Sequence, residues 1–403
     1  MKNNKIINSM ILGLIIATQS GVTAEPKLSE DIDVVLKIRP RVEIVDSTKS
    51  ATAFTNRLQI GLEAKNIANI DGLSVTFEAT KVTTLIDDYH SASAKGSNFN
   101  PDKATVVDPP LTNFTKAFLR YKFNQTTIVV GEKPLNLDTQ RFIGSVGWRQ
   151  MPQTFGMFSA SHQINTQLSV LGALLYRRNG IIPENDKGYR RGSGILHTEY
   201  VYSEPLKVTG YAYLLEDIHN TYGANIKGEV KAIPLIFSYR VEYALQRDPF
   251  IGNSNEIDIK TDYYNIEIGA KHHHLFSKIG YEVFGDKGNG STGFSTPYAT
   301  GHKFNGWSDV LLGKISSGNN DGLKDFNLTI GYASKSFGKS MLVYHKFDSV
   351  KNNTNFGSEI DFLYKKKILS QIDLLLKIAL YDNGDNSSFV DTNKYWIMTT
   401  IGF

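Results

Sequence analysis

The sequence predicts an all-β protein, namely a transmembrane antiparallel β-barrel of 18 strands, with 16 strands as the alternative. Three observations favour this fold class: hydrophobicity with a period of two, segments long enough to cross a bilayer, and connections that alternate between short and long. An amphipathic helix would place apolar residues at steps of three and four, and these segments lack that pattern.

The composition excludes several other classes of protein. The 403 residues are 41% hydrophobic and 21% charged, and the formal net charge is +4. Each span of a helical membrane protein needs about 20 mostly apolar residues, and only one segment of this chain is long and apolar. The charge is also too balanced for a nucleic-acid binder, which concentrates basic residues on one face. The absence of cysteine excludes disulfides and thiolate metal sites.

Residues 1–24 have the features of an export signal. Lys2 and Lys5 precede an apolar run over residues 10–17, and small residues lead up to Ala24. This arrangement predicts cleavage after Ala24 and a single barrel domain over residues 25–403. An uncleaved membrane anchor is the alternative, but the run is shorter than a bilayer span.

The first segment after the signal shows the strand pattern. From Ile32 to Ile44 every even position except Pro40 is apolar, whereas most odd positions are charged. Most segments of this kind exceed the length of about 5–6 residues usual in soluble sheets. They reach the length of about 9–11 residues that a tilted membrane strand requires.

Similar segments follow along the whole chain, and they give 18 expected strands. These lie at residues 31–45, 54–65, 73–82, 113–123, 126–133, 154–161, 166–178, 193–203, 206–216, 221–230, 233–247, 261–271, 274–286, 323–334, 340–348, 355–366, 370–381 and 392–403. The segment 302–313 could be another strand, in which case a neighbouring assignment would have to change.

The expected connections alternate in length. Short ones fall at residues 124–125, 204–205, 231–232 and 272–273, and long ones at 83–112, 134–153, 179–192, 248–260 and 287–322. Outer-membrane barrels have short periplasmic turns and long extracellular loops. An even number of strands therefore places both termini in the periplasm.

The last strand resembles the insertion signal of outer-membrane barrels. Tyr395, Ile397, Ile401 and the terminal Phe403 share one face. We expect the sheet to close into a barrel, because the backbone N–H and C=O groups of an open sheet edge would have no hydrogen-bond partners in lipid. We therefore expect the chain in the outer membrane of a Gram-negative bacterium, in contact with lipid and lipopolysaccharide, and delivered by periplasmic chaperones and the barrel assembly machinery.

The opposite face of the strands carries charges of both signs. The expected pore-lining residues are Lys37, Arg39, Arg41, Glu43, Arg57, Glu63, Arg120, Arg240, Glu242 and Glu267. Barrels of 16–18 strands leave an aqueous channel. The predicted function is a porin-like channel for diffusion of small hydrophilic solutes, with anionic solutes as candidates.

A local basic ladder could favour anions. Lys37, Arg39 and Arg41 follow one another on the inner face of the first strand, and Arg57 lies on the next strand. Such a ladder would lower the entry barrier for an anion. The alternative is that these cations pair with Glu43 and Glu63.

Two stretches resemble the alginate-export-like family of Gram-negative outer-membrane barrels. They are residues 131–155, which include Gly131-Glu132-Lys133-Pro134 and Gly147-Trp148-Arg149-Gln150, and residues 302–325, which include Phe304-Asn305-Gly306-Trp307-Ser308-Asp309. The resemblance implies an 18-stranded barrel. The charges expected in the lumen are of both signs, whereas the lumen of true alginate exporters is rich in arginine. This difference argues against alginate as cargo.

Both stretches fall in long loops that could fold inward as a constriction. The candidate constriction residues are Arg141, Arg149, Lys303 and Asp309, whereas Trp148 and Trp307 are expected to pack these loops against the barrel wall. Narrower alternatives to a diffusion channel are a specific exporter or importer of an anionic sugar polymer or organic acid, and a surface adhesin or structural barrel.

No catalytic, cofactor or metal site is expected. The run His272-His273-His274 falls at a predicted turn, and neighbouring residues of a strand point to opposite faces. Neither a phosphate-binding loop nor a nucleophile elbow occurs in the sequence. We therefore expect a protein that is not an enzyme and that does not bind nucleic acid.

Overall fold

The computed structural model describes residues 31–95, 98–252, 258–384 and 388–403. Asp33–Phe403 folds as one compact unit. The expected signal peptide, residues 1–24, lies outside the described residues, so its assignment stays a prediction.

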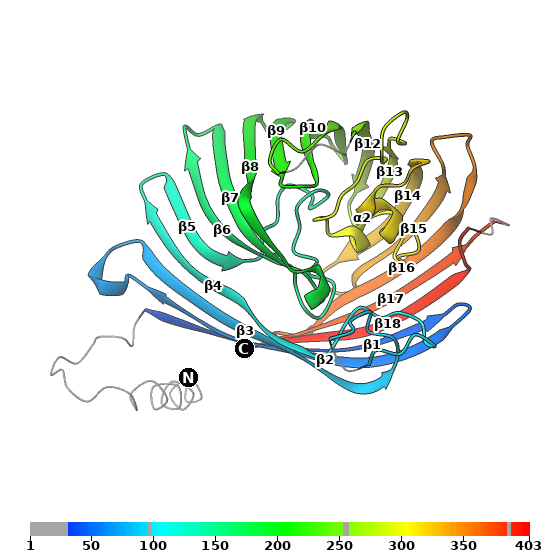
Figure 1. Cartoon of the computed structure of the whole chain (residues 1–403), viewed down its shortest axis with the longest axis horizontal. Coiled ribbons are helices and arrows are strands. Elements are labelled where there is room, and N and C mark those ends of the chain that lie inside the picture. The colour runs from blue at the N-terminus through cyan, green and yellow to red at the C-terminus, as the bar shows by residue number, and fades with distance from the viewer. Residues whose placement is uncertain (1–30, 96–97, 253–257, 385–387) are drawn as a thin grey trace. The chain divides into compact units, whose positions relative to one another are not determined.

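The compact unit is an antiparallel barrel of 18 strands, as predicted (Figure 1). Each strand pairs with its neighbours in sequence, and β1 also pairs with β18, where Val42 lies opposite Ile397. This last pairing closes the sheet and leaves no free edge, which a sheet in lipid requires.

The strands agree with the expected segments to within a few residues at most ends. In the first half they are β1 (Ile32–Asp46), β2 (Ser50–Lys65), β3 (Leu73–Asp88), β4 (Leu111–Phe123), β5 (Thr126–Lys133), β6 (Thr154–Gln163), β7 (Leu168–Asn179), β8 (Lys187–Ser203) and β9 (Leu206–Leu215). In the second half they are β10 (His219–Ala232), β11 (Leu235–Arg247), β12 (Lys260–His272), β13 (Leu275–Phe284), β14 (Leu323–Ser334), β15 (Gly338–Asp348), β16 (Asn355–Leu369), β17 (Ile372–Asp382) and β18 (Thr392–Gly402).

The segment 302–313 is not a strand. It begins in a 3₁₀ turn at Gly301–Lys303 and ends in a short helix, α2 (Leu312–Ser317). The sequence did not predict this helix, which forms inside a loop. Within the described residues, no helix has the length and apolar character needed to cross a membrane.

The outer surface of the barrel is apolar. Phe158, Ile268, Ile330 and Ile397 are each more than half exposed, and they alternate with residues that face inward. On β18 the exposed Tyr395 and Ile397 flank the buried Trp396, and Phe403 is also exposed. The period of two in the sequence thus separates a lipid-facing surface from a lumen-facing surface.

Long and short connections occupy opposite ends of the barrel. At one end, two residues join β4 to β5, β8 to β9, β10 to β11 and β12 to β13. At the other end lie L2 (residues 89–110), L3 (134–153), the β11–β12 loop (248–259) and L7 (285–322). Two connections at this second end are short, namely L1 (47–49) and residues 216–218.

Candidate functional site: the lumen and its two inward loops

L3 and L7 fold into the space that the strands enclose (Figure 1). Their apolar side chains belong to the same buried cluster as residues of the barrel wall. The loops contribute Leu135, Leu137, Ile143, Phe294, Tyr298, Leu311 and Ile315, and the wall contributes residues such as Phe155, Tyr213, Tyr263 and Phe347. Because this cluster excludes water, the free space in the barrel is narrower than the strand number alone implies.

Arg39 and Arg41 of β1 hold L3 against the wall. The guanidinium of Arg39 donates to the carbonyl oxygens of Gly147 (2.9 Å) and Trp148 (3.1 Å), and Arg41 also donates to Trp148 O, at 2.6 Å. Both arginines are buried, with 5% and 1% of their surface exposed. Arg39 therefore acts mainly on L3, whereas Arg41 also pairs with Glu43, at 3.4 Å, and with Asp108 of L2. Of the other members of the predicted ladder, Lys37 is exposed and Arg57 is half-buried.

A buried chain of charges joins β1, L3, L7 and β17, and we call it the clasp: Glu43, Arg149, Asp309, His302 and Lys377. The two Nη atoms of Arg149 lie 3.2 Å from Glu43 Oε2 and 2.8 Å from Asp309 Oδ2. Burial alone would lower the pKa of Arg149, but the carboxylates of Glu43 and Asp309 raise it above its usual value. The clasp fastens L3 to L7 and both loops to the wall.

His302 is the neutral link of the clasp. Its Nδ1 lies 2.8 Å from Asp309 Oδ1, and its Nε2 lies 2.7 Å from Lys377 Nζ. Burial lowers the pKa of His302 to about 3, so the ring is uncharged at neutral pH, with Nδ1–H donating to Asp309 and Nε2 accepting from Lys377. Burial would raise the pKa of Asp309, but His302, Lys394 and Arg149 together hold it below its usual range.

The tryptophans of the two family-like stretches surround Lys377. Trp148 stacks on His302 with ring centroids 4.5 Å apart, and Lys377 Nζ lies 4.4 Å from the ring centroid of Trp148 and 3.7 Å from that of Trp307. Trp307 packs in a cluster with Trp396 of the wall. These contacts attach the loops to the barrel wall.

Arg141 fastens L3 to the wall at a second place. Its Nε and Nη2 donate to the two carboxylate oxygens of Glu282 at 2.7 and 2.6 Å, and Nη2 also donates to the side-chain oxygen of Asn305. The guanidinium lies between the rings of Phe284 and Phe304. Because Arg141 is only 2% exposed, it lies within the packed part of the lumen.

Asp138, near the start of L3, makes a third attachment. Its carboxylate is 2.9 Å from Lys227 Nζ, accepts from Asn225 Nδ2 at 2.8 Å and pairs with Arg240. Arg240 also lies 2.9 Å from Glu242 Oε2. Burial would raise the pKa of Asp138, but Arg240 and Lys227 lower it to about 2.

The remaining predicted pore-lining residues lie away from these attachments. Glu63 pairs with Arg120, and Glu267 lies 2.7 Å from Lys278. Arg57 differs from them: its Nε is buried and has no hydrogen-bond partner among the described residues.

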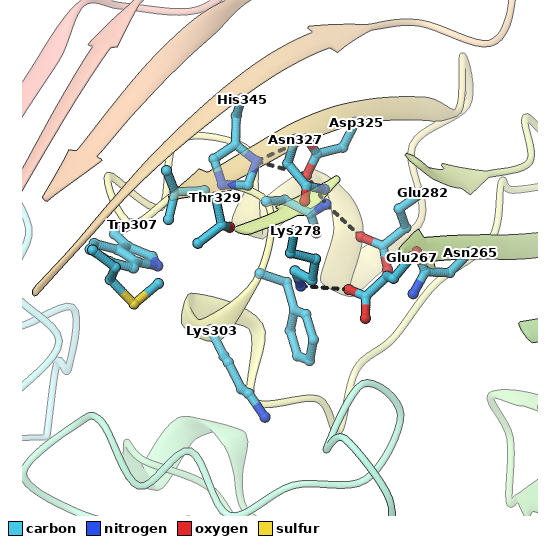
Figure 2. A pocket seen from close by; sticks show the side chains of 14 residues that line it. Asn265, Glu267, Lys278, Glu282, Lys303, Trp307, Asp325, Asn327, Thr329 and His345 are labelled. Carbon is cyan, nitrogen blue, oxygen red and sulfur yellow. Dashed lines mark hydrogen bonds and ion pairs between the residues drawn. The ribbon is translucent and has the colours of Figure 1, made fainter. Parts of the chain in front are cut away.

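A small polar cavity of about 100 Å³ opens beside L7 in the lumen (Figure 2). The pair Lys278–Glu267 and the pair His345–Asp325, at 2.9 Å, line it. Lys303 reaches the same cavity from L7, and its Nζ donates to Thr139 O of L3 at 3.0 Å. Of the four candidate constriction residues, Lys303 is the exposed one.

The structure brings five of the predicted residues into one place, namely Arg39, Arg41, Glu43, Arg149 and Asp309. Arg141, Lys303 and the pair Arg240–Glu242 belong to separate contacts. Gln150 of L3 also belongs here, because its side chain accepts from Arg39 Nε at 3.0 Å and donates to Thr55 Oγ1 at 2.9 Å. Sequence reasoning missed His302, Lys377, Asp138 and Gln150 as members of these contacts. Lys377 does stand out in the sequence as a charge within an apolar strand, and the other three lie within the stretches that carry the family resemblance.

The histidine run lies at the short-turn end, where all three residues are exposed. In the part of the chain that the structure describes, no group of three or more His, Cys, Asp or Glu residues is placed to hold a metal ion.

The fold is similar to that of several crystallised barrels. OccAB4 of Acinetobacter baumannii matches with a TM-score of 0.69 at 14% identity, over 94% of this chain and 100% of that one. OccAB2 of the same species matches with a TM-score of 0.71 at 17% identity, over 92% and 98%. OccK1 (OpdK) of Pseudomonas aeruginosa matches with a TM-score of 0.70 at 12% identity, over 93% and 99%.

Neither a family model nor a curated protein matches the sequence. At identities of 12–17% the solved structures show a shared fold. The resemblance of residues 131–155 and 302–325 to alginate-export-like barrels therefore stays a prediction. What the comparisons establish is the fold, a closed antiparallel 18-strand barrel of the kind crystallised as OccAB4, OccAB2 and OccK1.

Proposed function

We propose that this protein is an outer-membrane channel of a Gram-negative bacterium that passes small hydrophilic solutes and prefers carboxylate anions. The closed barrel has an apolar outer surface and a charged lumen. One similar barrel, OpdK, is described as an outer membrane protein. In the proposed orientation the long-loop end faces the outside of the cell and the short-turn end faces the periplasm.

The observation that carries the anion preference is Arg57. The nearby carboxylate of Glu78 is already engaged by Gln59 at 3.1 Å, Thr115 at 2.8 Å and Lys116 at 2.7 Å. A buried Nε–H without a partner is costly, and a carboxylate can accept from Nε and a terminal nitrogen of the same guanidinium in a bidentate geometry. Arg57 is therefore a cation of the lumen wall whose Nε–H has no partner among the described residues and is available to a passing anion.

A similar barrel supports the same class of solute. OpdK of Pseudomonas aeruginosa was crystallised with vanillate, an aromatic carboxylate.

Planar-bilayer recording with the purified full-length chain tests the channel. We expect stepwise conductance and a reversal potential that favours anions. Arg57→Gln should reduce the anion preference, whereas Arg190→Gln, a change at an exposed position of β8 near the long-loop end, should leave it unchanged.

Two results would contradict the proposal at different levels. A correctly folded barrel without conductance would exclude a channel. Conductance with equal permeability for anions and cations in both the parent and Arg57→Gln would leave a channel but exclude the role of Arg57.

The resemblance to alginate-export-like barrels supplies a second candidate, a conduit for an anionic sugar polymer. One observation favours it: both family-like stretches, residues 131–155 and 302–325, supply the loops that enter the lumen. A polymer would require these loops to move away from the wall. Release of oligouronates from protein-containing vesicles would support this function, and their retention while vanillate escapes would exclude it.

Lipid and lipopolysaccharide, the periplasmic chaperones and the assembly machinery are part of the same proposal. They follow from the barrel fold and from the expected signal peptide at residues 1–24.

A further inference from the structure

A second cavity lies at the long-loop end of the barrel, and we call it the outer pocket. Its volume is about 360 Å³, within the range of small-molecule sites. It is formed by the end of β1, by L1, L2 and L7 and by the start of β18, with Val45, Ser47, Thr48, Lys49, His90, Pro101, Lys103, Ala104, Thr105, Ser308, Val310, Thr392 and Lys394 as its lining. The cavity in Figure 2 shares no residue with it.

The charge of the outer pocket has one sign. Its lining includes Lys49, Lys103 and Lys394, and no residue of the lining is Asp or Glu. The cavity beside L7 is different, because Glu267, Glu282 and Asp325 line it together with lysines.

The lysines of the outer pocket are only partly engaged. Lys49 Nζ donates to the carbonyl oxygen of Pro101 at 2.5 Å, and Lys103 Nζ lies 2.7 Å from Asp88 at the end of β3. Lys394 Nζ lies 3.7 Å from Asp309, which is longer than a hydrogen bond. Each ammonium group has three donors, so donors remain for a ligand.

Neutral donors complete the pocket. His90 Nδ1 is buried and has no hydrogen-bond partner among the described residues. Thr48 and Thr105 are exposed and line the same cavity. A buried nitrogen without a partner is costly unless a ligand or water satisfies it. The outer pocket thus combines positive charge, two exposed threonines and an imidazole nitrogen without a hydrogen-bond partner among the described residues.

We propose that the outer pocket binds a small organic anion with a carboxylate or phosphate group before the anion enters the lumen. Lys49 and Lys103 would attract the charged group, and Thr48, Thr105 and His90 would hydrogen-bond it. Ser308 and Lys394 connect the pocket to the clasp, because Ser308 precedes Asp309 and Lys394 faces it. The idea that the bound anion is cargo rests on the proposed function, but binding itself can be tested without conduction.

Calorimetric titration of the full-length chain in detergent tests the binding. Vanillate is the carboxylate probe, and inorganic phosphate is the phosphate probe. All variants are made in the Arg57→Gln protein, which is the background. An anion bound at Arg57 in the lumen then does not add to the measured heat. The affinity should fall with ionic strength, since the lysines are partly exposed.

In that background the double variant Lys49→Ala/Lys103→Ala should bind the preferred probe at least about tenfold more weakly, because charge-assisted hydrogen bonds are lost. Thr105→Glu, which places a carboxylate in the pocket, should abolish binding. Lys351→Ala is the matched control, because Lys351 is exposed at the long-loop end but outside the pocket, and it should bind with unchanged affinity.

Unchanged affinity in both the double variant and Thr105→Glu would overturn the proposal, as would the absence of binding of either probe to the background chain. Preference for one probe identifies the head group as carboxylate or phosphate. Binding that these variants weaken, in a protein that conducts no current, would support the outer pocket while the proposed channel function fails.

Discussion

Arg141 shows how a single buried cation fixes a loop in this lumen. Both oxygens of Glu282 accept from its guanidinium, and Tyr263 Oη and Asn305 Nδ2 donate to the same carboxylate. Such an arrangement offsets the cost of removing two charges from water only while every partner is present.

Arg141→Ala should therefore destabilise the barrel by about 3–5 kcal/mol, since it leaves Glu282 buried without its cation. Equilibrium unfolding in urea, with the barrel folded into lipid vesicles, measures the change. Arg190→Ala is the control, because an exposed side chain should contribute at most about 0.5 kcal/mol. Equal stability of the two variants would refute the structural role of Arg141.

His302 gives the clasp a pH dependence. Its pKa in the folded protein, about 3, lies below the value of 6.5 expected in the unfolded chain. The unfolded chain therefore takes up the proton first as the pH falls, and the free energy of unfolding decreases between about pH 6.5 and pH 3, by about 1.4 kcal/mol per pH unit within that window.

His302→Gln should flatten this dependence, because an amide can donate to Asp309 and accept from Lys377 but does not titrate in this range. Unfolding measured at pH 7 and pH 4.5 in both proteins provides the test. A parent and variant with the same slope would show that His302 is not the titrating group.

At the scale of elements, the clasp decides how L3 and L7 sit in the barrel. The guanidinium of Arg149 contacts both Glu43 of β1 and Asp309 of L7. The two loops thus depend on a residue whose partners are 106 and 160 positions away in sequence.

Arg149→Met should detach the loops from one another and cost about 3–5 kcal/mol, because two buried carboxylates lose their common cation. We expect larger and noisier single-channel currents than in the parent. Arg190→Met provides the comparison at an exposed position. Currents of unchanged size and noise in a destabilised variant would show that the clasp supports the fold without setting the aperture.

The elements themselves were largely predictable. The alternation of apolar and polar residues identified all 18 strands, because each side chain of a membrane strand faces either lipid or the lumen. The helix α2 and the 3₁₀ turn at Gly301–Lys303 were missed. Both lie within L7, where contacts with the wall rather than a periodic pattern decide the local conformation.

At the scale of the whole molecule, the apolar outer surface and the closed sheet make the barrel compatible with lipid. Ile397 lies near the middle of β18 and is 55% exposed on the outer face. Opposite it on β1 lies Val42, so the closing seam of the barrel is itself apolar toward lipid.

Ile397→Arg should lower the stability in lipid vesicles by about 2–4 kcal/mol if the position lies at the depth of the bilayer centre. Thr400→Lys is the matched change on the lumen side of the same strand, where Asp373 lies opposite, and we expect little effect there. Urea titrations of both variants measure the difference. A larger loss for Thr400→Lys would contradict the assignment of the two faces.

The sequence by itself determined the strand segments and the two faces of the sheet, and it favoured 18 strands over 16. Alternation with a period of two is a local property of the chain, because successive side chains of a strand point to opposite faces. It also indicated which charges face inward. Only the tertiary structure decided what those charges do. Arg39, Arg41 and Arg149 hold loops, whereas Arg57 Nε has no hydrogen-bond partner among the described residues. Lys49, Lys103 and Lys394 line a pocket whose lining contains no Asp or Glu. The reason is physical: an ion pair forms only where the closed barrel brings two distant segments together. A local sequence pattern does not specify which distant segments meet.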